Sequence, residues 1–238
     1  MSTSRFFPKQ MGKYNMLSLL IALLLMLMIV PIFEHYFFDR IIMNTSLTII
    51  LVFGVVGSSR TPFLFPFGAI TATIAIAISW TTMLINVPWL FVVNCVLQSM
   101  FFATMAGFIL HRVLTRHLAT FQSLFGAVCV YLLLGLAWAM LYWGLERIDS
   151  ESLSFERQIT VDLDNTEGEV TAFSQLVYFS FVTMSTLGYG DIYPETPIAQ
   201  TLTWMQSVTG QFYLAILVAR LMSALPQYRQ ENQPTLES

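Results

Sequence analysis

Long apolar runs, separated by short polar stretches, dominate the pattern of hydrophobic and polar positions along this chain. Six of these runs predict helices that cross a membrane, since the hydrocarbon core of a bilayer takes about 20 apolar residues in a helix. A shorter amphipathic segment over residues 172–185 predicts a helix that enters the membrane without crossing it. The six runs cover residues 16–33, 41–56, 63–85, 89–110, 121–144 and 198–225.

The composition is that of a membrane protein with several spans. Of the 238 residues, 56% are hydrophobic and only 11% are charged. Residues 1–15 carry basic side chains ahead of the first run, as a cleaved signal peptide would. That run is too long for the apolar region of a signal peptide and no small-residue cleavage site follows it, so we expect a retained first span.

Basic residues in the loops predict the orientation, because Lys and Arg stay preferentially on the cytoplasmic side. With the N-terminus inside, 8 of the 11 Lys and Arg residues fall in cytoplasmic segments. These eight are Arg5, Lys9, Lys13, Arg60, Arg112, Arg116, Arg220 and Arg229. We therefore predict a multi-pass protein of the plasma membrane, surrounded by lipid, with both termini in the cytoplasm.

Enzyme chemistry has little support in the sequence. Cys95 and Cys129 both lie inside apolar runs, where buried small side chains are the expected reading and a disulfide framework is not. The chain has no Walker loop, no His-Glu-x-x-His and no cysteine pairs at metal-ligand spacing. We expect no enzyme activity, no cofactor and no nucleic-acid partner.

Residues 183–191, which read Thr-Met-Ser-Thr-Leu-Gly-Tyr-Gly-Asp, are the most informative stretch. Gly188 and Gly190 can adopt positive φ at little cost, which lets successive backbone carbonyls point the same way. Rings of such carbonyls replace the hydration shell of K⁺ in a membrane pore. The Thr186 hydroxyl adds an oxygen at the inner end, and Asp191 places a negative charge at the outer end.

The run from Thr186 to Asp191 resembles the selectivity-filter signature of the tetrameric potassium channels, and the six spans resemble a prokaryotic-type member. The resemblance implies an all-α membrane protein of voltage-gated-channel-like architecture, with six transmembrane helices, a re-entrant pore helix and a filter loop. Its pore domain would be residues 121–225. The parts are an outer helix 121–144, an acidic extracellular loop 145–171, a pore helix 172–185, a filter 186–191 and an inner helix 198–225.

The resemblance also assigns roles within this pore domain. Potassium would bind at Thr186, Leu187, Gly188 and Tyr189, with Gly190 completing the ion-binding run. The residues implied to support the filter are Thr183, Ser185, Asp191, Tyr178 and Phe179. Val182 occupies a place where some members have a glutamate that bonds the aspartate after the filter. Gly210 is either the hinge of the inner helix or a close-packing glycine.

Two features of the pore domain follow from the residues themselves. Thr171 or Ser174 can supply the capping oxygen at the start of the pore helix. The outer loop holds eight acidic residues and two arginines. The acidic residues either concentrate cations at the mouth of the pore or simply keep the exposed loop solvated. The acidic residues are Glu146, Asp149, Glu151, Glu156, Asp162, Asp164, Glu167 and Glu169.

The first four spans, residues 16–110, resemble a voltage-sensor domain without its gating charges. Between residues 89 and 110 the polar positions are Asn94, Gln98, Ser99 and Thr104, and none is basic. Without charges to move through the field, such a domain gains nothing from the membrane potential. We expect a channel that is not voltage-gated, with a cytoplasmic linker 111–120 and a short cytoplasmic tail 226–238.

One filter strand cannot surround an ion, so a single copy per chain implies a homotetramer that passes K⁺ down its gradient. Two alternatives remain open. The chain could be a non-conducting regulatory subunit of another channel. It could also be an intramembrane enzyme or transporter that uses His111 and His117, or Asn94 and Gln98.

Overall fold

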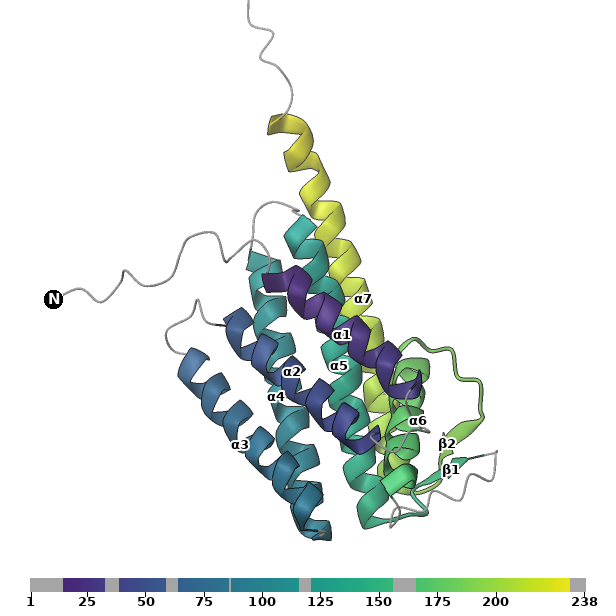
Figure 1. The fold of residues 1–238 in the computed structure, drawn as a ribbon. Helices are drawn as coiled ribbons and strands as arrows, with labels where there is room; N and C mark the ends of the chain where they lie inside the picture. The colour runs from purple at the N-terminus through teal and green to yellow at the C-terminus, as the bar shows by residue number, and fades with distance from the viewer. Residues whose placement is uncertain are drawn as a thin grey trace, which may run out of the picture.

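Seven helices and two short strands make up the described part of a computed structural model, which covers residues 15–32, 39–58, 64–85, 87–115, 121–155 and 166–231 (Figure 1). The elements, in chain order, are α1 (Asn15–Ile32), α2 (Asp39–Ser58), α3 (Leu64–Leu84), α4 (Pro88–Thr115), α5 (Phe121–Ile148), β1 (Leu153–Phe155), α6 (Thr166–Met184), β2 (Ile192–Pro194) and α7 (Pro197–Glu231).

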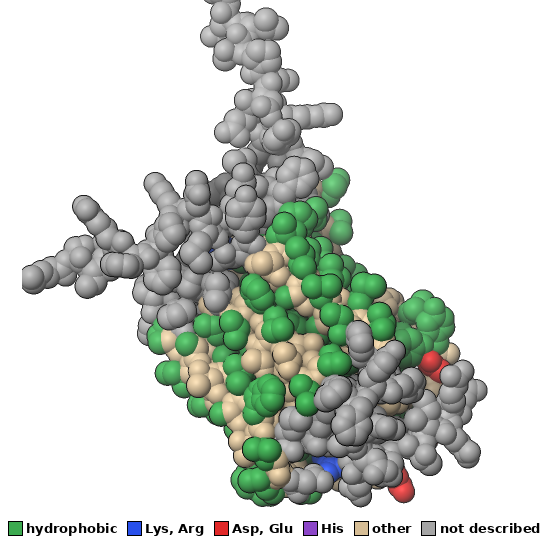
Figure 2. Space-filling view, viewed as in Figure 1, with side chains coloured by type: hydrophobic (Ala, Val, Ile, Leu, Met, Phe, Trp, Pro, Cys, Tyr) green, Lys and Arg blue, Asp and Glu red, His purple; other side chains and the backbone are tan. Residues whose placement is uncertain are grey.

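Apolar helices account for most of these elements. By length and hydropathy, Pro88–Thr115 and Ser123–Ile148 are able to cross a membrane among the described residues. Three shorter apolar helices cover Met16–Ile32, Ile41–Val55 and Gly68–Thr82. Apolar side chains also spread over much of the described surface in Figure 2, as expected for helices in contact with lipid or with other chains.

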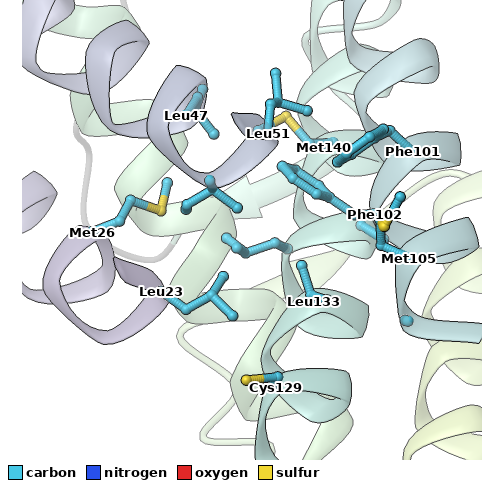
Figure 3. Packing of buried hydrophobic residues seen from close by; sticks show 14 of the residues in the cluster. Leu23, Met26, Leu47, Leu51, Phe101, Phe102, Met105, Cys129, Leu133 and Met140 are labelled. Atoms are coloured by element: carbon cyan, nitrogen blue, oxygen red, sulfur yellow. The ribbon is translucent and has the colours of Figure 1, made fainter. Parts of the chain in front are cut away.

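Helix α5 lies at the centre of the packing. It contacts α1 and α4 on one side and α6 and α7 on the other, while α3 reaches only α2 and α4 among its main neighbours (Figure 1). Figure 3 shows the core where α1, α2 and α4 meet α5: Leu23, Leu47, Phe102, Leu133 and Met140 come together there, each at most 2% exposed.

The short sheet joins the segment that precedes α6 in the chain to the segment that follows it. Strands β1 and β2 are antiparallel, with Leu153 opposite Pro194 and Phe155 opposite Ile192. The Glu195 amide continues the pairing by donating to the Ser152 carbonyl at 3.0 Å. The segment that follows α5 is thereby fixed to the segment that precedes α7.

Several helices extend beyond the apolar runs that predict them, because the backbone hydrogen bonds continue into polar residues that are adequate helix formers. Helix α4 ends at Thr115 instead of 110, and α5 ends at Ile148 instead of 144. Helix α6 begins at Thr166 instead of 172. Thr171 and Ser174 therefore lie inside α6, and the prediction that one of them caps its start is wrong.

Glu146 also departs from the sequence-based expectation. Counted among the acidic residues of the outer loop, it is instead 3% exposed in the last turns of α5. Its Oε2 accepts a hydrogen bond from the Ser152 hydroxyl at 2.7 Å, which partly replaces the water that a carboxylate loses on burial. Glu156, Asp162 and Asp164 of the same loop lie outside the described residues.

Candidate functional site

The segment between α6 and β2, which contains the predicted filter, has an unusual backbone. The φ angles are 58° at Thr186, 55° at Gly188 and 83° at Gly190. Every second residue is therefore left-handed, and Leu187 and Tyr189 between them are not. Such alternation turns successive N–H groups to one side of the strand and leaves the carbonyl oxygens on the other. A strand with this geometry can present a row of oxygens to a cation.

Thr186 stands out within this alternation. It is the only non-glycine residue with positive φ in the described part of the chain, and a β-branched side chain is especially disfavoured there. A conformation of this kind costs on the order of 1–3 kcal/mol and persists only where the surroundings impose it. The sequence analysis named the glycines as the left-handed positions and did not extend the pattern to Thr186.

The end of α6 holds the inner part of the segment in place. The Ser185 amide donates to the Phe181 carbonyl at 3.0 Å, the Thr186 amide to the Thr183 carbonyl at 3.0 Å and the Leu187 amide to the Val182 carbonyl at 2.9 Å. The Ser185 hydroxyl adds a bond to the Val182 carbonyl at 3.2 Å. Ser185 and Thr183 thus act through backbone bonds that turn the chain out of the helix.

Tyr178 and Asp191 hold the outer part. The Tyr178 hydroxyl donates to Asp191 Oδ2 at 2.7 Å, and the Ile192 amide donates to Oδ1 at 3.2 Å. The hydrogen bond to the carboxylate, and then desolvation, raise the pKa of Tyr178 to about 12, so its hydroxyl stays protonated and able to donate. Asp191 leads directly into β2, so the outer end is tied to both α6 and the sheet.

The segment itself is open in a single chain. All residues from 185 to 190 are exposed, with Leu187 at 55% and Tyr189 at 67%. A Cβ added at Gly188 or Gly190 would meet nothing within 4 Å, so the backbone angle, and not crowding within the chain, requires glycine there.

A buried polar network lies behind the segment and joins three helices. The Gln206 amide nitrogen on α7 donates to the Ser180 carbonyl at 2.9 Å and to its hydroxyl at 2.6 Å. The Ser180 hydroxyl donates to the Gly135 carbonyl of α5 at 2.7 Å. The Tyr142 hydroxyl donates to Gln206 Oε1 at 2.7 Å. Ser180, Gln206 and Tyr142 are each fully buried, which fixes α6 between α5 and α7.

This network was not predicted from the sequence. The signal was available as a glutamine in the apolar run 198–225 and a serine in the middle of the pore helix. Polar residues inside a membrane helix are retained where they find hydrogen-bond partners. The partners themselves come from α5 and could not be named without the fold.

Phe179 and Gly210 occupy packed positions around the same helix. The Phe179 ring, 4% exposed, meets the Tyr142 ring edge-on with centroids 5.0 Å apart. A Cβ added at Gly210 would lie 2.6 Å from Met184 Cγ and closer still to the Met184 carbonyl oxygen. Gly210 therefore lets α7 approach the last residue of α6. This contact favours close packing for Gly210, and its role as a hinge remains a prediction.

The residues considered for an alternative site lie elsewhere. Asn94 and Gln98 are buried on α4, where the Gln98 amide nitrogen donates to Asn94 Oδ1 at 3.2 Å. Helix α4 packs mainly against α3 and α5. His111 is exposed near the end of α4, and His117 lies outside the described residues. The structure does not bring His111 together with Asn94 and Gln98, which lie at least three helical turns away.

Comparison with known proteins supports an ion channel. A family model described as "Ion channel" matches residues 151–227, which hold the segment just described and most of α7 but make up less than half of the chain. Two-pore potassium channel 4 of Arabidopsis thaliana is 44% identical over 55 residues, or 23% of this chain. The match spans only 19% of that relative's length. No solved structure matches the chain.

These similarities support a place in the potassium channel superfamily for the segment from β1 to α7. Together with the apolar helices, they support a membrane protein. Helices α1 to α5 lie outside the residues that the family model matches.

Removing the Tyr142 hydroxyl should destabilise the pore helix. In Tyr142→Phe, Gln206 Oε1 stays buried without its donor, and we expect a loss of about 1–2 kcal/mol in stability. Thermal unfolding of the purified protein in detergent measures the change. Tyr131→Phe is the control, since the half-buried Tyr131 donates no hydrogen bond to a described residue, and equal unfolding temperatures for the two variants would refute the role of the network.

Gly210→Ala should lower the unfolding temperature because the new methyl group overlaps the Met184 carbonyl oxygen, which belongs to the backbone and cannot move aside easily. Gly107→Ala is the matched control, since a Cβ at Gly107 meets nothing within 4 Å and alanine is the better helix former. We expect Gly107→Ala to equal or exceed the wild type. A Gly210→Ala protein as stable as this control would show that α7 does not pack closely on α6.

Proposed function

We propose that this protein is a potassium-selective channel that conducts K⁺ passively through a pore formed by four copies of the chain. The observation that carries the proposal is the alternation of left-handed residues at Thr186, Gly188 and Gly190. A backbone of this kind can present successive carbonyl oxygens on one side of the strand. The carbonyls of Thr186, Leu187, Gly188 and Tyr189, with the Thr186 hydroxyl, are the proposed K⁺ ligands.

Potassium is the ion that this arrangement suits. Backbone carbonyls carry no net charge, so they can replace the water around a monovalent cation without holding it too tightly to leave. The C-terminal end of α6 runs into the filter and contributes the partial negative charge of a helix dipole. The relative from Arabidopsis thaliana is itself named a potassium channel, which supports the same ion.

A fourfold assembly follows from the filter's incompleteness in one chain. The filter motif occurs once in the sequence, and residues 185–190 are exposed in a single chain. Helix α7 also presents large apolar side chains outward, among them Trp204, Val208 and Phe212. Closed symmetry around the filter would cover these side chains and complete each ring of oxygens.

The proposed membrane topology has six spans, formed by α1 to α5 and α7, with α6 as a re-entrant helix and both termini in the cytoplasm of a plasma-membrane protein. We further propose that voltage does not gate the channel. No Lys or Arg lies in α4 before Arg112 in its last turn, so α4 carries no charge through the centre of the field. Opening would depend on α7, the surrounding lipid or another protein.

The alternative, a non-conducting regulatory subunit, predicts the same fold without flux. No described feature favours it over conduction. Ion flux through the purified chain separates the two.

Purified protein in liposomes should pass K⁺ and largely exclude Na⁺, and Gly188→Ala should abolish the K⁺ flux. Alanine in a left-handed conformation costs on the order of 1–2 kcal/mol in each chain, and four chains suffer it together around one ion path. A flux assay driven by a K⁺ gradient gives the size of the effect. Adding valinomycin at the end of the assay measures the total trapped K⁺. Gly107→Ala should conduct normally.

Two outcomes would contradict this proposal. Wild-type protein that passes K⁺ and Na⁺ equally would exclude selectivity, and correctly assembled protein without any flux would support the regulatory subunit. Size-exclusion chromatography of the Gly188→Ala protein must show an unchanged assembly for its loss of flux to count.

Tyr178→Phe should shorten the time that the channel spends in its conducting state. The variant keeps the aromatic ring but removes the donor that holds Asp191 at the outer end of the filter. Single-channel recording should show briefer openings and a lower K⁺/Na⁺ permeability ratio than the wild type. Tyr193→Phe is the control, because Tyr193 on β2 is comparably exposed and its hydroxyl donates to no described residue. Identical recordings from the two variants would rule out a role for the Tyr178 hydrogen bond.

A further inference from the structure

A cluster of buried polar side chains lies among helices that are otherwise apolar, on the far side of α5 from the filter. Asn44 on α2, Ser79 and Thr82 on α3, and Asn94 and Gln98 on α4 are each at most 7% exposed. Together with Trp143 of α5, they line a small cavity. Polar groups inside a membrane bundle need partners, so the question is whether each of these atoms has one.

Most of them do. The Ser79 hydroxyl donates to Asn44 Oδ1 at 2.8 Å, the Thr82 hydroxyl to the Ser79 carbonyl at 2.8 Å and the Gln98 amide nitrogen to Asn94 Oδ1 at 3.2 Å. Two of the side chains that line the cavity each have a buried polar atom with no hydrogen-bond partner among the described residues: Gln98 Oε1 and Trp143 Nε1. Their side chains are 1% and 4% exposed.

The chemistry of these two atoms is complementary. Gln98 Oε1 can only accept a hydrogen bond, and Trp143 Nε1 can only donate one. Among the described residues, no charged side chain lines the cavity, which disfavours an ion there. The occupant must be neutral and able to donate and accept at once.

The size of the cavity narrows the choice further. The centre of a water molecule can occupy ≈ 10 Å³ of it, which is about the room that one buried water requires. A water with two to four polar partners is a stable part of a folded structure.

We propose that one ordered water molecule occupies this cavity, donates to Gln98 Oε1 and accepts from Trp143 Nε1. The water joins α4 to α5 in the interior of the bundle. The Trp143 ring lies 4.7 Å from Phe91 of α4, edge-on, and 4.8 Å from Phe173 of α6, centroid to centroid. The site thereby links the first four helices, through Trp143, to the pore helix, whether or not the chain conducts.

Structure determination tests the site directly. A cryo-EM or crystal structure of the wild-type assembly, at a resolution that shows ordered waters, should contain one density peak within hydrogen-bond distance of both atoms. An empty cavity would overturn the proposal, and so would density too large for one water. This test does not depend on any variant folding.

A double-mutant cycle gives an independent measurement. Trp143→Phe removes the donor and Gln98→Met removes the acceptor, and either change alone breaks the bridge. The unfolding temperature of the double variant should therefore fall by about 2–4 °C less than the sum of the two single shifts.

The matched cycle combines Gln98→Met with Trp138→Phe. Trp138 also lies on α5 but does not line the cavity, so its shift should add to that of Gln98→Met. Additive shifts in the Gln98 and Trp143 cycle would overturn the bridging role. Non-additivity of the same size in the Trp138 cycle would do so as well, since the coupling would then not come from the cavity.

Discussion

The left-handed backbone at Thr186, Gly188 and Gly190 is the constraint on which the rest of the pore unit depends. An isolated strand would relax from it, because Thr186 gains nothing locally from a positive φ. Bonds from the end of α6 hold the strand at Val182 and Thr183, and the Tyr178–Asp191 bond holds its other end. The proposed filter is thus a strained segment held at both ends, and its middle is exposed in a single chain.

Helix α5 holds α6 and α7 in place by supplying hydrogen-bond partners to both. It supplies the Gly135 carbonyl to Ser180, the Tyr142 hydroxyl to Gln206 and the Ala127 carbonyl to Tyr213 of α7. Apolar packing alone lets neighbouring helices slide, because lipid tails and leucine side chains offer similar surroundings. Hydrogen bonds at several positions along α5 fix where α6 and α7 lie relative to it. They thereby fix the position of the proposed filter.

Local patterns revealed the helices and the two glycines, while features built from distant segments stayed hidden. Gly188 and Gly190 were identifiable because a side chain at positive φ is penalised at the residue itself. Strand β1 pairs with a strand beyond the whole of α6, so no window of sequence signals it. The burial of Glu146 escaped notice for the same reason, since it depends on Ser152 and the turn into that strand. The early start of α6 at Thr166 lies among polar residues, where hydrophobic periodicity gives no signal.

Because the proposed filter is held in place within one chain, its ordering does not have to accompany the association of subunits. Since one chain already holds the alternating backbone, the conformational entropy of ordering it is lost when that chain folds and not when the proposed tetramer assembles. Association then resembles the docking of preorganised surfaces, which loses less affinity to ordering than coupled folding does. Exchange of a subunit would therefore replace one wall of the pore with another of the same shape.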